Sequence, residues 1–252
     1  MITMEWLALS KLKNNWRSQI KIYYQRIALN FSQCDLCGNN TEQQTLLCST
    51  CLAELPLFKQ EIVQGDLLNW PAINKSLPRI HFDHLFCLSP YLPPFNHWLS
   101  QFKYQGRFEL ASLFASLLAK QWQEIQSTSS ADLILSVPLH ISKWQHRGYN
   151  QAHLIAKPFS QLLQIPYHGS ALVRLKKNAS QVGQTGAKRR KNLTNAFTLH
   201  QPLAKAVNHV LLIDDVLTTG STASEISKLL KQNGVEEVTV ITVCLTLPKH
   251  PS

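Results

Sequence analysis

The chain has 252 residues, enough for one large domain or for one domain with a small module. Hydrophobic residues make up 44% of it, which excludes a mainly disordered, low-complexity protein. Lysine and arginine number 25 against 15 aspartate and glutamate residues, so the net charge is +10. This excess favours an anionic partner, namely a phosphate-bearing ligand, nucleic acid or an anionic membrane surface, although a merely basic protein is the alternative.

The first 30 residues mix apolar side chains with lysine and arginine. The pattern predicts an amphipathic helix that either packs on the rest of the protein or lies on a membrane or on nucleic acid. The sequence contains no run of about 18 uncharged apolar residues, so we expect no membrane-spanning helix. We also expect no signal peptide. The expected location is therefore cytoplasmic, with peripheral contact to the inner membrane left open.

Four of the six cysteines lie in a C-x2-C-x10-C-x2-C pattern. In a chain without an export signal, this paired spacing predicts that four thiolates converge on one tetrahedral Zn²⁺ ion. Four reduced thiols or a redox pair is the alternative. Cys87 and Cys244 lie alone in apolar stretches and are expected to fill the core. The expected zinc ligands are Cys34, Cys37, Cys48 and Cys51.

Strand-like runs alternate with helical patterns from about residue 81 onward, which predicts an α/β domain with a parallel sheet. Pro158 interrupts one helical pattern, so that helix is expected to kink or restart there. The expected strands are 84–88, 133–137, 171–175, 210–213 and 238–244. The expected organisation is a basic N-terminal segment (1–30), a zinc-ribbon module (31–56), a connector (57–80) that includes the start of the next domain, and the α/β domain (81–252).

Residues 210–222 combine an apolar strand that ends in Asp214 and Asp215 with a hydroxyl-rich loop and the start of a helix. Backbone N–H groups and hydroxyls of such a loop can surround a phosphate, which the positive end of a helix also favours. The two carboxylates are placed to accept hydrogen bonds from a vicinal diol, as in a ribose 5-phosphate. An ordinary capped helix is the alternative, but it does not explain the paired acids. The expected phosphate-binding residues are Thr218, Thr219, Gly220, Ser221 and Thr222.

This segment resembles the phosphoribosyl-pyrophosphate (PRPP) loop of type I phosphoribosyltransferases. Further motifs lie along the chain, namely the cysteine module, 102–107 (FKYQGR), 137–140 (VPLH), 147–152 (RGYNQA) and 181–197. Through these motifs, from about residue 34 onward, the chain is similar to the ComF family of bacterial competence proteins. The resemblance implies a type I phosphoribosyltransferase-like parallel sheet flanked by helices, preceded by a zinc ribbon.

The resemblance implies roles for single residues. Asp214 and Asp215 would hold the ribose hydroxyls and are the candidate catalytic residues. Leu139 and His140 match the pyrophosphate loop, where Mg²⁺ would bridge the leaving group. The basic stretch 174–191 matches the mobile loop that closes over PRPP, with a plain surface loop as the alternative. Further contacts to PRPP are expected from residues near the pyrophosphate loop, namely Arg147, Asn150 and Gln151.

Three functions are compatible with these features. The first is a ComF-like competence protein that acts in DNA uptake and natural transformation, binding PRPP or a nucleotide phosphate and single-stranded DNA, near other DNA-uptake proteins. The second is an enzyme that transfers ribose 5-phosphate from PRPP to a base or amine, and the third is a PRPP or nucleotide sensor without turnover. Tyr104 and Tyr149 can stack bases or pack structurally. The candidate anion- or nucleic-acid-binding residues are Lys103, Arg107, Lys188, Arg189 and Arg190.

Overall fold

The computed structural model describes residues 33–41, 46–77, 79–125, 131–139, 147–175 and 196–246. The chain divides into two compact units, Met1–Leu55 and Pro56–Ser252. Within the described residues, no helix is both long and apolar enough to cross a bilayer. The expectations for the N-terminal segment, for most of the basic stretch and for four single residues fall outside these ranges, the four being His140, Lys188, Arg189 and Arg190.

The described part of the first unit is a turn followed by a short helix. The Cys34 N–H donates a hydrogen bond to the Asn39 carbonyl at 2.7 Å, and Gly38 reverses the chain between them with a φ of +74°. The helix α2 (Ser49–Ala53) begins directly after Cys48, which is its N-cap residue. The first cysteine pair therefore lies in a tight turn, and the second lies in the first turn of a helix.

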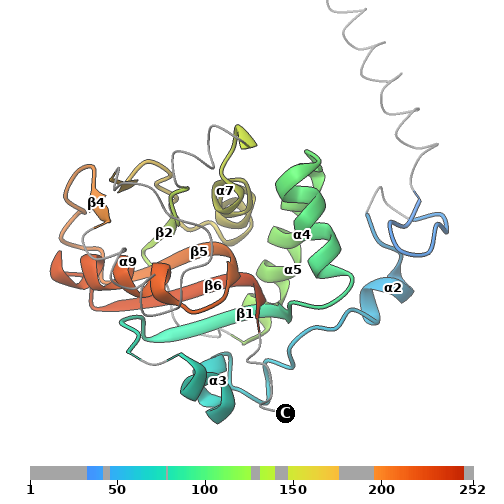
Figure 1. Ribbon diagram of the computed structural model, residues 1–252, viewed down its shortest axis with the longest axis horizontal. Helices are drawn as coiled ribbons and strands as arrows, with labels where there is room; N and C mark the ends of the chain where they lie inside the picture. The colour runs from blue at the N-terminus through green and yellow to red at the C-terminus, as the bar shows by residue number, and fades with distance from the viewer. Residues whose placement is uncertain are drawn as a thin grey trace, which may run out of the picture. The chain divides into compact units, whose positions relative to one another are not determined.

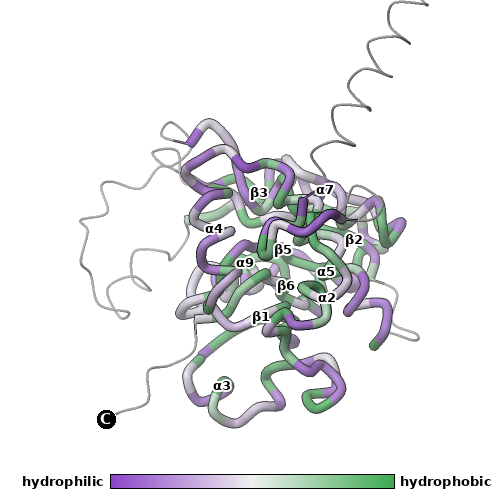
Figure 2. The backbone as a smooth tube through the Cα atoms, turned by 90° about the vertical axis from the view of Figure 1, so that its right-hand side faces the viewer, coloured by the Kyte–Doolittle hydropathy of each residue, from purple (hydrophilic) through white to green (hydrophobic). Residues whose placement is uncertain are grey.

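The second unit is built on a four-stranded parallel sheet with the strand order β1-β6-β5-β2 (Figure 1). The strands are almost entirely buried, as a parallel sheet covered on both faces requires, and Figure 2 shows their hydrophobic character. This confirms the predicted α/β class. The bounds are β1 His84–Pro90, β2 Leu133–Ser136, β5 His209–Leu217 and β6 Glu237–Leu245.

The expected strand at 171–175 is shorter and lies outside this sheet. It forms β3 (Leu172–Arg174), which pairs antiparallel with β4 (Phe197–Leu199). The two strands bracket residues 176–195, so β4 brings the chain back to β3 after that stretch.

Two layers of helices cover the sheet (Figure 1). Successive side chains of a strand point to opposite faces, and β1 shows both layers. Phe86 contacts Trp122 of α5, with 5.2 Å between ring centroids. Its neighbour Cys87 belongs to the opposite core cluster, with Ile73 and Ile226. The first layer contains α4 (Phe95–Tyr104), α5 (Glu109–Ile125) and α7 (Gln151–Leu163). The second contains η2 (Leu67–Asn69), α3 (Pro71–Ser76) and α9 (Ser221–Gln232).

Helix α7 continues through Pro158 to Leu163, so the helix does not restart at the proline. Proline removes one backbone hydrogen bond within a helix. Here the apolar face on both sides of it is buried, including Ile155 and Phe159. Because tertiary packing supplies most of the stability of a helix in a protein, it can outweigh a single lost bond.

Residues 57–80 form part of the second unit's core. The Phe58 N–H donates to the Leu88 carbonyl at 2.9 Å, and the Gln60 side chain donates to the Cys87 carbonyl at 2.7 Å. Leu67 and Leu77 are buried in the same cluster as the strands. The expected connector therefore packs against the sheet, which positions Leu77 behind the loop that follows β5.

Candidate functional site

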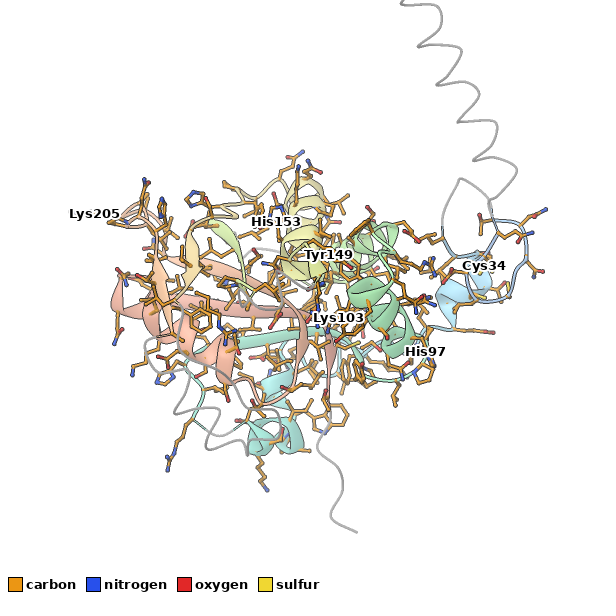
Figure 3. The ribbon with its side chains drawn as sticks, turned by 45° about the horizontal axis from the view of Figure 1, so that its top comes forward. Cys34, His97, Lys103, Tyr149, His153 and Lys205 are labelled. Carbon is orange, nitrogen blue, oxygen red and sulfur yellow. The ribbon has the colours of Figure 1, made fainter. Side chains whose placement is uncertain are left out.

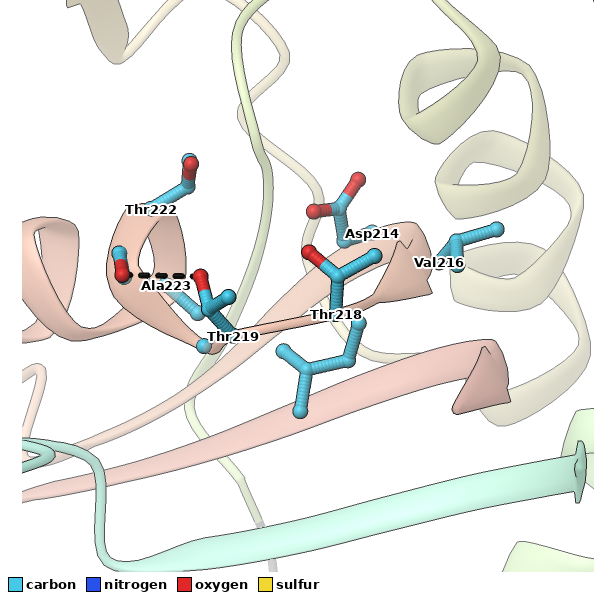
Figure 4. A pocket seen from close by; sticks show the side chains of 9 residues that line it. Asp214, Val216, Thr218, Thr219, Thr222 and Ala223 are labelled. Atoms are coloured by element: carbon cyan, nitrogen blue, oxygen red, sulfur yellow. Dashed lines mark hydrogen bonds between the residues drawn. The ribbon is translucent and has the colours of Figure 1, made fainter. Parts of the chain in front are cut away.

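The hydroxyl-rich loop joins β5 to α9 at the carboxyl edge of the sheet, where parallel α/β sheets bind their ligands. Gly220 is the N-cap of α9 and has a φ of +66°. It brings no side chain to cap the first turn of the helix, whose N–H groups need an acceptor. The Thr219 and Ser221 hydroxyls are hydrogen-bonded to each other at 2.9 Å (Figure 4).

A small hollow of about 40 Å³ lies at this loop (Figure 4). All five residues expected to bind phosphate line it, together with one of the two expected acids. The other lining residues, Val216, Leu217 and Ala223, were not predicted from the sequence, because their apolar side chains give no signal for phosphate binding. The full lining consists of Asp214, Val216, Leu217, Thr218, Thr219, Gly220, Ser221, Thr222 and Ala223.

The two acids of the doublet have different surroundings. Both lie inside β5, which continues beyond them to Leu217 instead of ending at them as expected. Asp214 lines the hollow, and one of its carboxylate oxygens accepts a hydrogen bond from the Asp215 N–H at 2.8 Å. The Asp215 carboxylate instead lies 3.0 Å from the Lys103 ammonium of α4. Neighbouring residues of a strand point to opposite faces, which explains the difference.

The Lys103–Asp215 ion pair is largely shielded from solvent. The two side chains are 18% and 14% exposed, and Figure 3 shows Lys103 where α4 meets the sheet. Lys103 was expected to attract an anionic ligand, and Asp215 to bind ribose. The structure brings these two residues together, so that each compensates the charge of the other.

The end of β2 is tied to the start of α7 beside the same loop. Asn150 is the N-cap of α7 and accepts a hydrogen bond from the Ala152 N–H at 3.1 Å. Its amide also donates to the Val137 carbonyl at 3.0 Å, and the Val137 N–H donates to the Ile213 carbonyl at 2.9 Å. The oxygen and the nitrogen of the Asn150 side-chain amide thus each bind a backbone group. Leu139, which lies two residues after Val137, is half-buried.

Arg147 connects two motifs that lie far apart in the sequence. Its guanidinium donates to the Gln151 side chain at 3.2 Å and to the Tyr104 hydroxyl at 2.9 Å. The Tyr149 hydroxyl also donates to the Phe102 carbonyl. The 102–107 and 147–152 motifs are therefore in direct contact. Arg107 of the first motif binds Glu109 at 2.7 Å.

A partly buried polar network that no sequence motif indicated links β2 to α7. The Tyr167 hydroxyl lies 2.8 Å from the Ser136 hydroxyl and 2.7 Å from His153 Nδ1, and Figure 3 labels His153. Burial raises the pKa of Tyr167, so its hydroxyl stays protonated. A Cβ atom at Gly169 would lie 2.9 Å from that hydroxyl, so glycine is needed there for the close approach.

In the first unit, the four predicted metal ligands gather in one cluster. Their sulfur atoms all lie within 4.8 Å of one another, an arrangement that can hold a metal ion, and the Cys37 and Cys48 sulfurs are 3.7 Å apart. Four thiolates at about 2.3 Å from one tetrahedral Zn²⁺ ion lie about 3.8 Å from each other. The spacing and the all-thiol donor set both fit zinc.

The thiol pKa values in this cluster move in opposite directions. Burial raises the pKa of Cys34, but hydrogen bonds from the backbone at Cys48, Cys37 and Leu36 outweigh it and lower the pKa to about 6. Hydrogen bonds with Cys37 and Cys48 raise the pKa of Cys51. The protein alone therefore favours one thiolate and discourages another. A bound dication would stabilise all four as thiolates.

Residues 150–251 match the model of the phosphoribosyl transferase domain. Together with the parallel α/β sheet, this match shows a phosphoribosyltransferase-like fold in the second unit. The chain is 32% identical to the DNA utilization protein YhgH of Escherichia coli strain K12, over 85% of this chain and 90% of that protein. It is 33% identical to competence protein F of Haemophilus influenzae, over 86% of each. The chain belongs to the ComF family.

A shorter match extends to a more distant relative. Over 54% of this chain and 53% of that protein, it is 30% identical to competence protein ComFC of Bacillus subtilis. The expectations of a ComF-family chain and of a phosphoribosyltransferase-like fold are both confirmed.

Proposed function

We propose that this protein acts in the use of incoming DNA and binds the ribose 5-phosphate part of PRPP or of a nucleotide at the β5–α9 loop. The names of its relatives, which refer to DNA utilization and to competence, support the first part. The observation that carries the second part is the convergence of Asp214, the hydroxyl loop and the start of α9 on one hollow.

The chemistry of the hollow suits a phosphorylated sugar. The loop hydroxyls and the first-turn N–H groups of α9 would donate hydrogen bonds to the 5-phosphate. Asp214 would accept hydrogen bonds from the ribose diol, each contributing about 1.5–3 kcal/mol. Asp215 would act through Lys103, by holding its ammonium at the same edge of the sheet. The segment at Leu139, just after β2, would face the pyrophosphate of PRPP, whose charge a bound Mg²⁺ would neutralise.

We further propose that the protein binds single-stranded DNA and that the four cysteines hold one structural Zn²⁺ ion. The net charge of +10 supports binding to a polyanion. Such binding predicts an affinity that falls steeply with salt concentration. The compact four-thiol cluster supports the metal.

A calorimetric screen on the full chain tests the ligand proposal. PRPP with Mg²⁺, a nucleoside monophosphate and a short oligonucleotide are each titrated into the wild type and into Asp214→Asn. The variant should lose affinity for the phosphorylated ribose and keep its affinity for the oligonucleotide. Glu236→Gln is the matched control, because it removes an exposed carboxylate that does not line the hollow. An absence of heat with both sugar phosphates would contradict the proposal.

Release of pyrophosphate distinguishes an enzyme from a sensor. The match to the phosphoribosyl transferase domain favours transfer to a base or amine as the second candidate function. Incubation of the wild type with PRPP, Mg²⁺ and a panel of bases should release pyrophosphate if the protein is a transferase. Binding without release would assign the hollow to a sensor.

A further inference from the structure

Tyr104 is an exposed aromatic residue at the C-terminal end of α4, and the guanidinium of Arg147 lies over its ring. The Arg147 Cζ atom lies 4.8 Å from the centroid of the Tyr104 ring. The guanidinium also donates to the Tyr104 hydroxyl at 2.9 Å and to the Gln151 side chain at 3.2 Å. Gln151 is only 2% exposed, whereas Tyr104 is 62% exposed. Arg147 is thus held against the ring by a buried anchor, while much of the ring remains open to solvent.

A chain of contacts connects this stack to the edge of the sheet that carries the hollow. The residue before Tyr104 is Lys103, whose ammonium is paired with Asp215. On the other side, Asn150 joins the segment of Arg147 to the Val137 carbonyl, directly after β2. The stack is therefore anchored next to both β2 and β5, at their carboxyl ends.

A second exposed ring lies close to the stack. Phe108 is 52% exposed and packs edge-on against Tyr149, with 4.7 Å between ring centroids and an interplanar angle of 76°. Gly106, with a φ of +69°, turns the chain between Tyr104 and Phe108. Two exposed aromatic residues thus flank one turn, beside the segment that carries Arg147.

The positive charge of Arg147 is also available to a ligand. Among the described residues, the ion pairs involve other cations, and none joins Arg147 to a carboxylate. A largely exposed aromatic ring, a guanidinium held over it and a positive charge with no carboxylate partner among the described residues match a flat, π-rich group attached to a phosphate backbone. Unpaired bases of a single strand have this chemistry, because duplex bases are already stacked.

We propose that Tyr104 and Arg147 form a stacking platform for an unpaired nucleobase of single-stranded DNA. This inference rests on the proposed binding of single-stranded DNA and names the surface that contacts the base. It also gives Arg147 a role other than the expected contact to PRPP. Base stacking on aromatic side chains tolerates any sequence, so the platform serves DNA of arbitrary origin.

The test compares two strands that carry the same number of phosphates. A labelled oligothymidylate and an abasic strand of equal length are titrated with the full chain, and fluorescence anisotropy gives both affinities. The wild type should bind the oligothymidylate about tenfold more tightly. Tyr104→Leu should remove this preference and leave the affinity for the abasic strand unchanged. Arg147→Lys, which keeps the charge but loses the plane, should reduce the preference.

Two variants serve as controls. Tyr104→Phe keeps the ring and should retain the preference, and Trp70→Leu removes another exposed ring, one that is 44% exposed on the α3 side of the unit, and should also retain it. If Tyr104→Leu fails to fold, Arg147→Lys decides the question, because an undiminished preference in that variant would also overturn the platform. Equal binding of both strands by the wild type, or a preference that survives Tyr104→Leu, would overturn the platform alone. Binding of neither strand would overturn the proposed DNA binding together with the platform.

Discussion

Lys103 of α4 and Asp215 of β5 form an ion pair, with 3.0 Å between Nζ and Oδ2. The pair links a helix of the covering layer to the acidic doublet of the candidate site. Because both side chains are more than four-fifths shielded from solvent, removal of one partner leaves a charge that water only partly compensates. The pair is therefore expected to matter for stability, unlike an ordinary surface ion pair.

Stability measurements on three variants test this pair. Lys103→Met and Asp215→Asn should each lower the free energy of unfolding by about 2 kcal/mol. The double variant should lose clearly less than the sum of the two, with a coupling energy of about 1 kcal/mol or more. Urea unfolding supplies the four free energies of this cycle. Strictly additive losses would show that the two charges do not interact.

The backbone of the hydroxyl loop depends on Gly220. An alanine at its φ of +66° would be strained by roughly 1–2 kcal/mol, and its Cβ would lie 3.4 Å from Leu77 and 3.5 Å from Phe82. Gly220→Ala should lower the melting temperature and weaken binding of the phosphorylated ribose. Gly234→Ala is the control, because its φ is +93° and nothing lies within 4 Å of its Cβ. It should lower stability and leave ligand binding intact.

Metal analysis tests the cysteine cluster. The purified wild type should contain about one equivalent of zinc by mass spectrometry. Cys34→Ser should remove the metal, because it deletes one of four converging thiols. Cys87→Ala should retain it, since Cys87 is buried in the core of the second unit. A wild type free of metal after purification without chelators would contradict the zinc assignment.

The hydrogen bonds to the Asp132 carboxylate should make the stability of the protein depend on pH. Its carboxylate accepts hydrogen bonds from the Asn208 and His209 N–H groups, both at 2.8 Å. The His209 and Asn208 bonds lower the pKa of Asp132 in the folded state. The stabilisation is therefore present above the unfolded pKa of about 3.9 and is lost as the pH falls through the lower folded value.

The variant Asp132→Ala should lower the free energy of unfolding at neutral pH by about 1 kcal/mol, because solvent screens the charge of this accessible carboxylate. The difference from the wild type should shrink in acid, where the wild-type carboxyl is itself protonated. Urea unfolding at several pH values measures it. A difference that stays constant down to the lowest pH would rule out the carboxylate as its source.

The features that the sequence predicts are those with a local signal. The apolar runs of β1, β5 and β6, the thiol spacing and the hydroxyl loop each depend on residues that are close together in the chain. The strand pleat would also have separated Asp214 from Asp215, since adjacent residues of a strand point to opposite faces. The prediction that both acids hold one diol did not use that signal; in the structure Asp214 lines the hollow and Asp215 contacts Lys103.

Contacts between distant segments had no such signal. The sequence does not indicate that Lys103 meets Asp215 or that the Arg147 guanidinium lies over the Tyr104 ring, because both contacts depend on how helices pack on the sheet. Asn150 was expected to contact PRPP because of its polar side chain and its place near the pyrophosphate loop. In the structure its amide caps α7 and donates a hydrogen bond to the Val137 carbonyl. Tertiary packing decided these roles.

The most direct test is a calorimetric titration of PRPP with Mg²⁺ into the wild type, Asp214→Asn and Asp215→Asn. The wild type should bind, and Asp214→Asn should bind at least about tenfold more weakly, because a charged hydrogen bond is worth about 1.5–3 kcal/mol. Asp215→Asn should instead lower stability, through Lys103. Wild-type affinity in Asp214→Asn, or no binding by the wild type, would contradict a phosphorylated-sugar site at this loop.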